Sequence, residues 1–156
     1  MPAPTLADCR SASANEGGNV PFFMNVTASV LDSCLIHSAS DLDFGIVDSQ
    51  FTQNIDQSTM IALSCPLGTP WKLSMNSGTY PVGEQRRMMN DHAEYIAYDL
   101  YRDSARVQRW SQNTVLNGVG LGQTQTVNVP VYGRVPRQSS LPSGSYNDHV
   151  TVTLTY

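Results

Sequence analysis

The sequence is poor in charge, and above all in lysine. Asp, Glu, Lys and Arg make up 14% of its 156 residues, against about a quarter in a typical soluble protein, and Lys72 is the single lysine. The net charge is −4, so the chain has no excess of basic residues for contacts with phosphate groups. We therefore expect no nucleic-acid binding. Ser, Thr, Asn, Gln and Gly replace the charged residues, a composition typical of turns and of strands with one wetted face.

Long apolar runs are missing as well. No stretch approaches the roughly 18 apolar residues that a membrane helix needs, so we expect no membrane span. The opening residues Met-Pro-Ala-Pro-Thr lack a charged and then apolar leader. We interpret them as the start of a processed, secreted chain.

Helical periodicity is scarce, and alternation with a period of two takes its place. In the cleanest run, Val150, Val152, Leu154 and Tyr156 share one parity, with Thr and His residues between them. Similar runs predict strands at residues 41–47, 59–65, 71–75, 94–101 and 126–135, and a helical turn is conceivable only at 104–110. Turns with Gly and Pro separate the runs, which predicts an antiparallel β-sandwich.

The first alternating run is unusually long. Residues 1–19 are polar and lack a period, and Val20, Phe22, Met24 and Val26 then begin a run of one parity that continues to Val30. Eleven strand residues would span about 35 Å, whereas most strands have five or six residues. We therefore divide the chain into an N-terminal arm, residues 1–19, and one domain, residues 20–156.

The three cysteines are Cys9, Cys34 and Cys65. Cys34 and Cys65 each close a predicted strand, so a disulfide between them would link two elements of one sandwich. Such a bridge would stabilise the fold by about 3–4 kcal/mol in the loop-entropy account. The alternative is three free thiols in a cytosolic protein. Cys9, in the arm, is expected to be unpaired, although a link to another chain stays open.

Catalytic and metal-binding patterns are weak. The histidines, His37, His92 and His149, are not spaced as metal ligands, and Asp91-His92-Ala93-Glu94 has no nucleophile nearby. Several aspartates lie close in sequence without the spacing of a calcium loop. They are Asp41, Asp43, Asp48 and Asp56. The arginines at 86, 87, 102, 106 and 109 have acidic neighbours, which favours ion pairs on the surface. We expect no enzyme activity, no metal and no cofactor.

A series of short stretches occurs in a recognisable order. They are Cys34, Leu42-Asp43-Phe44-Gly45, the strand ending at Cys65 with Gly68-Thr69-Pro70, Arg87-Met88-Met89, Ile96–Asp103 with Trp110, Val131–Pro136, and Pro142–Asp148 leading into Val150–Tyr156. Together they resemble the spore coat protein U domain family over about residues 20–156. The best understood members of that family are subunits of archaic, Csu-type chaperone–usher pili, which support adhesion and biofilm formation.

This resemblance implies a fold and a set of partners. The fold is an incomplete immunoglobulin-like antiparallel β-sandwich that lacks its last strand and is completed by a donor strand from another chain, a form of β-augmentation. The implied partners are neighbouring pilus subunits, a periplasmic chaperone and an outer-membrane usher. The protein would be in the periplasm during assembly and then at the cell surface in a fimbrium.

The two ends of the sequence fit this mechanism. The C-terminal run of Val150, Val152, Leu154 and Tyr156 would form the acceptor edge, because an uncovered strand edge beside an open core requires a partner. The donor strand would contain Val20, Phe22, Met24 and Val26, with residues 20–25 as the segment available to a neighbour. The later part of the run, about Val26 to Cys34, would be the chain's own first strand. Residues 5–19 are polar where a longer donor would alternate. The donor is therefore short, the subunit is a minor or adaptor one, or the first strand is wholly internal.

Two other functions stay open. One is a self-contained lectin-like binding module or tip adhesin, with exposed aromatic residues as its binding surface. Its candidate residues are Tyr80, Tyr95, Trp110 and Tyr132. The other is a structural protein of a spore coat, which would share the fold and not the secretion route.

Overall fold

The computed structural model describes residues 17–30, 33–48, 52–138 and 141–156. The chain divides into two compact units, residues 1–30 and residues 31–156. All regular structure in the described residues is β-strand. The strands are β1 (Leu35–Ala39), β2 (Ile55–Ser64), β3 (Pro70–Met75), β4 (Arg86–Met89), β5 (Tyr95–Tyr101), β6 (Leu116–Val119), β7 (Val127–Val135) and β8 (Val152–Thr155).

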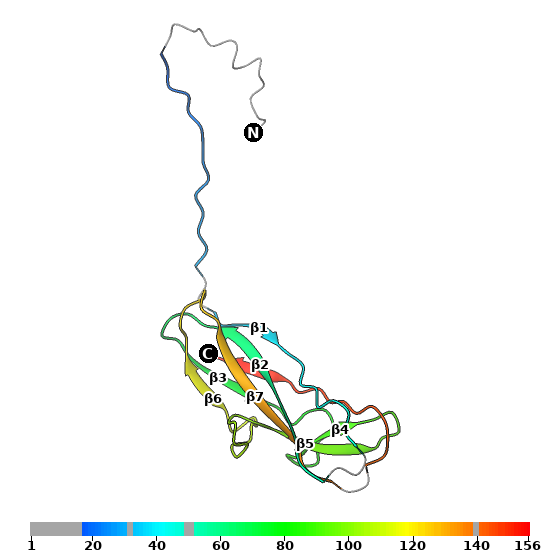
Figure 1. Ribbon diagram of the computed structural model, residues 1–156. Coiled ribbons are helices and arrows are strands. Elements are labelled where there is room, and N and C mark those ends of the chain that lie inside the picture. Colours follow the sequence, from blue (N-terminus) through cyan, green and yellow to red (C-terminus); the bar gives the residue numbers. More distant parts are fainter. Residues whose placement is uncertain (1–16, 31–32, 49–51, 139–140) are drawn as a thin grey trace, which may run out of the picture. The chain divides into compact units, whose positions relative to one another are not determined.

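The strands form two antiparallel sheets (Figure 1). The first sheet has the order β1-β2-β7-β5-β4, and the second has the order β6-β3-β8. Alternation in the sequence explains which residues lie between them, because successive side chains of a strand point to opposite faces. In β3, for example, Trp71, Leu73 and Met75 are buried while Lys72 is exposed. The predicted all-β sandwich is confirmed.

Four of the sequence-based strands coincide with observed ones. The runs at 59–65, 71–75, 94–101 and 126–135 correspond to β2, β3, β5 and β7, and β2 begins four residues earlier than expected, at Ile55. The C-terminal run forms the shorter β8. Residues 104–110 form turns and bends, so the conceivable helical turn is not present.

The prediction of a strand at residues 41–47 is wrong. This segment has no regular structure, and Gly45 adopts a left-handed φ of 72° that would interrupt a strand. The Asp43 side chain accepts a hydrogen bond from the Gly45 N–H at 2.8 Å, which stabilises the turn. Leu42 and Phe44 pack instead against the core, and a Cβ added at Gly133 in β7 would meet the Leu42 side chain at 2.4 Å. Gly133 therefore makes room for this segment.

The expected first strand also differs. Sequence alternation placed its internal part at about Val26–Cys34, but the described residues up to Val30 contain no strand and are exposed. The first strand of the sandwich is β1, which begins at Leu35, directly after Cys34. Alternation alone cannot form a strand, because the backbone groups need a neighbouring strand to pair with. Within this single chain the alternating run has none among the described strands.

Candidate strand-acceptor site

The strand β8 lies at the edge of the three-stranded sheet, and its inward residues are only partly covered. Val152 is opposite Met75 and Leu154 is opposite Leu73, so each pair shares one face of the sheet. Met75 and Leu73 are fully buried, whereas Val152 and Leu154 are half-buried. The core is therefore less well covered along β8 than along β3.

The strand β1, at an edge of the other sheet, also has inward residues that are only partly covered. Ile36 is opposite Leu63 and Ala39 is opposite Ile61. Leu63 is 0% exposed, but its partner Ile36 is 39% exposed. All five residues of β1 are exposed, including those whose partners in β2 are buried. Both edge strands thus present apolar inward residues that the described part of the chain does not fully cover.

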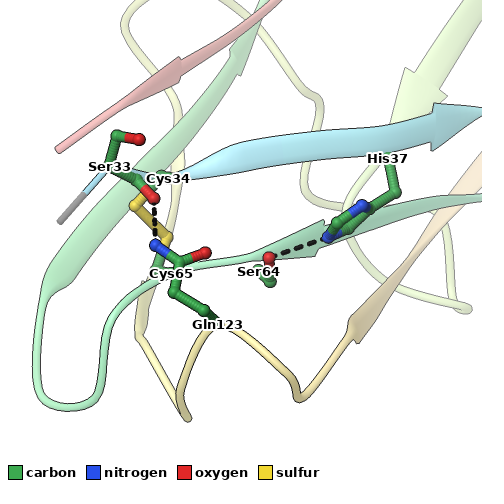
Figure 2. The surroundings of a disulfide bond; sticks show 6 residues. All are labelled: Ser33, Cys34, His37, Ser64, Cys65 and Gln123. Atoms are coloured by element: carbon green, nitrogen blue, oxygen red, sulfur yellow. Dashed lines mark hydrogen bonds between the residues drawn. A yellow bond between two sulfur atoms is a disulfide. The ribbon is translucent and has the colours of Figure 1, made fainter. Parts of the chain in front are cut away.

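A disulfide fastens the exposed strand β1 to its neighbour. Cys34, just before β1, is bonded to Cys65, just after β2, so the expected bridge is confirmed (Figure 2). Gln123 donates a hydrogen bond to the Ser33 carbonyl beside it. His37 Nε2 and Ser64 Oγ lie 2.7 Å apart, a second side-chain link between β1 and β2. These contacts hold an edge strand that pairs on one side only among the described strands.

The predicted acceptor residues differ in how far they are buried. Val150, Val152 and Leu154 pack partly against the core. Tyr156 follows the end of β8 and is 62% exposed. Sequence alternation did not indicate the second edge, because β1 is short and a β-bulge between Ile36 and Ser38 interrupts its pattern.

The predicted donor residues are strongly exposed within their own chain. Val20, Phe22, Met24 and Val26 are between 82% and 91% exposed. Phe23 is exposed as well, although its opposite parity does not place it in the predicted donor set. A run of large apolar side chains in water is costly, and such a run marks an interaction site.

Apart from the edge strands, a buried ion cluster connects the two sheets. Arg86 in β4 is 1% exposed and donates hydrogen bonds to the Asn76 carbonyl, at 2.7 Å from Nη2 and 3.0 Å from Nε. Its Nη1 lies 3.4 Å from Asp99, and Arg109 contacts the same carboxylate at 2.9 Å. Desolvation lowers the pKa of Arg86, and Asp99 opposes that shift. The expectation of surface pairing is wrong for Arg86, because the strand alternation turns this residue inward.

The tyrosine in the same region is also held by a polar contact. Tyr98 is buried and donates a hydrogen bond to Asp148 at 2.5 Å. Burial and this contact with a carboxylate raise the pKa of Tyr98 well above its ordinary value. Both the ion cluster and this pair join elements across the sandwich, so we assign them a structural role.

The aromatic candidates for a binding surface do not form one group. Trp110 is fully buried and its Nε1 donates to the Leu73 carbonyl at 3.0 Å, so it belongs to the core. Tyr80 and Tyr95 are neighbours, with ring centroids 6.3 Å apart, and Arg87 lies 3.8 Å from the Tyr95 ring. Tyr132 contacts Arg106 instead.

The residues considered as metal ligands do not come together in the described part of the chain. No group of three metal-ligating side chains occurs among the residues that the structure describes. Asp56 is paired with Arg134 at 2.7 Å, which lowers the pKa of its carboxyl. Asp43 serves the turn at Gly45. Cys9 and the arm up to residue 16 lie outside the described residues. No helix in the described ranges is long and apolar enough to cross a membrane.

The fold and its two uncovered edges define a class of protein, the antiparallel β-sandwich that is incomplete on its own. Comparison with known proteins gives the family. The chain belongs to the spore coat protein U domain family, whose model matches residues 21–153. It is also 32% identical to Protein U of Myxococcus xanthus, over 96% of this chain and 88% of that protein.

A solved structure agrees with this family. The chain is similar to one in a pre-assembly complex of chaperone and tip adhesion subunit from the archaic chaperone–usher Csu pili of Acinetobacter baumannii, with 28% identity and a TM-score of 0.58. The match covers 81% of this chain and 40% of that one, so this chain spans about two fifths of the length of its structural relative. A chaperone–tip adhesin complex of CFA/I fimbriae is similar only at 9% identity and a TM-score of 0.46, too little to support an argument.

Proposed function

We propose that this protein is a structural subunit of a secreted surface pilus and that it polymerises by donor-strand complementation. A donor segment from one subunit would add a strand at the β1 and β8 edges of the next. Adhesion and biofilm formation would be properties of the resulting fibre. The likeness to a chain of the Csu pilus complex supports this proposal.

One observation carries the proposal: the same chain has uncovered inward residues at two sheet edges and an exposed apolar segment that alternates. Ile36, which is 39% exposed, and Leu154, which is half-buried, represent the first feature, and Phe22 and Met24 represent the second. A strand inserted at these edges would form backbone hydrogen bonds that fix its direction and register. Each large side chain that becomes fully buried would contribute about 1.5–3 kcal/mol.

Before it is incorporated into a fibre, such a subunit needs a temporary cover. An exposed sheet edge beside an open core promotes aggregation. We therefore propose a periplasmic chaperone as the first partner, in line with the chaperone–subunit complex named above. An outer-membrane usher would then mediate the exchange of chaperone for donor segment, and the subunit would move from the periplasm to the cell surface.

The test uses full-length chains with altered donor positions. Phe22→Asp with Met24→Asp places charges where apolar contacts are expected, and the matched control, Asn25→Asp with Thr27→Asp, alters the opposite parity. Size-exclusion chromatography should show oligomers for the parent and the control, and monomers for the donor variant. A synthetic peptide of residues 17–30 should bind that monomer. Oligomers of unchanged size in the donor variant, or a peptide that does not bind, would contradict the proposal.

A structural protein of a spore coat is the second candidate. The name of the family, whose model matches residues 21–153, favours it. Immunogold electron microscopy of cells that produce this chain separates the two candidates. Labelled filaments that extend from the cell support the pilus, and label confined to a continuous coat supports the alternative.

A further inference from the structure

An exposed apolar surface lies at one end of the sandwich. We define the end patch as Leu67, Val119, Leu121 and Tyr156, which are 81%, 57%, 52% and 62% exposed. The loops that carry Leu67 and Leu121 are joined by hydrogen bonds between Gly68 and Gly120, at 2.9 Å, and between Gly120 and Thr69, at 2.7 Å. Val119 and Tyr156 line one shallow hollow together with Trp71. The four residues therefore lie near one another at this end of the sandwich.

Close packing around two glycines holds this surface in shape. A Cβ at Gly120 would lie 2.0 Å from the Pro66 carbonyl oxygen, and a Cβ at Gly118 would lie 2.0 Å from the Trp71 indole. Both glycines allow a neighbouring group to approach more closely than any side chain would permit. A surface that is already rigid loses little conformational entropy on binding.

The end patch lies near Cys34, where the chain enters the sandwich. The Gly122 N–H donates to the Cys65 carbonyl at 3.0 Å, and Cys65 is bonded to Cys34. Gln123 donates to the Ser33 carbonyl, so the loop that follows Leu121 is attached directly to that junction (Figure 2). Any protein that holds the N-terminal segment is therefore tethered to this end of the molecule.

We infer that the end patch is a second contact surface between neighbouring subunits and binds the same copy of the chain whose β1 and β8 edges take this chain's donor segment. The inference rests on the proposed function. In the sequence, seven residues separate Val26 from Cys34, and a chain of that length spans at most about 25 Å. A copy that holds Val20–Val26 is thus confined near the patch, at an effective concentration in the millimolar range or above.

The confinement explains why a small patch is sufficient. Four apolar side chains cannot hold two free proteins together, because association in solution carries a large entropic cost. Once the donor strand is bound, the entropic cost of association has already been covered by that contact. Burial of even part of the patch then slows dissociation. The occupant is therefore a second copy of this chain and not an unrelated protein, for which the patch alone is too small.

The test measures how fast oligomers dissociate after dilution. Leu67→Ser with Leu121→Ser removes half of the patch, and Met60→Ser is the matched control. Met60 is 52% exposed, as is Leu121, but it lies in the middle of β2 opposite Pro130. Oligomers of the patch variant should dissociate about tenfold faster than those of the parent and of the control. Unfolding midpoints of all three chains should agree within a few degrees.

Binding of the peptide of residues 17–30 distinguishes the possible failures. It is measured on full-length chains that carry Phe22→Asp and Met24→Asp, with and without the patch substitutions, and should be equal. Equal dissociation rates for patch variant and parent, with normal peptide binding, overturn the inference and leave the proposed function intact. If the patch substitutions abolish peptide binding, the patch belongs to the acceptor site and the inference is also wrong. If the peptide binds neither chain, the proposed function itself fails.

Discussion

At the scale of single residues, Gly118 allows close packing in the core, although glycine is a residue type typical of turns. Its position in β6 lies directly against the indole of Trp71, and an added Cβ would be 2.0 Å from Trp71 Cζ2. We expect Gly118→Ala to lower the free energy of unfolding by about 1–3 kcal/mol, because the buried ring has no space to move. Chemical denaturation checks this. Gly18→Ala is the control, since nothing lies within 4 Å of that position, and it should cost almost nothing.

The disulfide allows a second prediction at this scale. Cys34 and Cys65 are 31 residues apart in sequence. Cys34→Ser and Cys65→Ser should each lower the free energy of unfolding by about 3–4 kcal/mol in the loop-entropy account. Because both changes remove the same bond, the double variant should cost no more than either single one. Urea denaturation of the three variants measures this, and additive losses would show that the thiols contribute separately.

At the scale of secondary structure, sequence patterns predicted strands correctly where an alternating run has a partner strand in the same chain. β2, β3, β5 and β7 satisfy that condition. The run from Val20 alternates equally well but has no partner strand in the described chain, and periodicity carries no information about where a partner is. β6 was missed for the opposite reason: Gly118 reads as a turn residue, and its actual role, contact with Trp71, depends on tertiary structure.

The candidate site was predictable only in part for related reasons. The C-terminal acceptor strand and the donor parity follow from alternation along the sequence. The second edge, β1, depends on which strands are neighbours, and a β-bulge interrupts its pattern. The buried position of Arg86 was not indicated either, since charged residues are rarely buried unless they are paired. Its pairing with Asp99 and with two backbone carbonyls becomes visible only in three dimensions.

Arg86 also gives a prediction for how the sheets are held together. It extends from β4 to the carbonyls at the end of β3, so it joins the two sheets. Arg86→Ala should cost about 3–5 kcal/mol, because it leaves the Met75 and Asn76 carbonyls without their buried donor and removes one of the two arginines that pair with Asp99. Thermal unfolding measures the loss. Arg87→Ala is the control, since Arg87 is only half-buried, and a loss as large there would show that the ion cluster has no special role.

At the scale of the whole molecule, the incomplete sandwich should be less stable alone than with a donor strand. A ligand that binds only the folded state adds stability that rises with its concentration, by about 2.7 kcal/mol at one hundred times its Kd. For a chain of this length that corresponds to roughly 5–10 °C in the unfolding midpoint. Differential scanning calorimetry of the Phe22→Asp and Met24→Asp chain, with increasing amounts of the peptide of residues 17–30, measures the shift.

The control in this experiment is a peptide of the same length in which Asp replaces Phe22 and Met24. It keeps the backbone that pairs with the edges and loses the apolar contacts, so it should shift the midpoint by less than half as much. Equal shifts from both peptides would mean that backbone pairing alone stabilises the chain. No shift from either, at concentrations where the native peptide is in large excess, would mean that the sandwich does not take up this strand. Uncovered edges in an isolated chain show only that a strand can be added, whereas the difference between the two peptides measures what its side chains contribute.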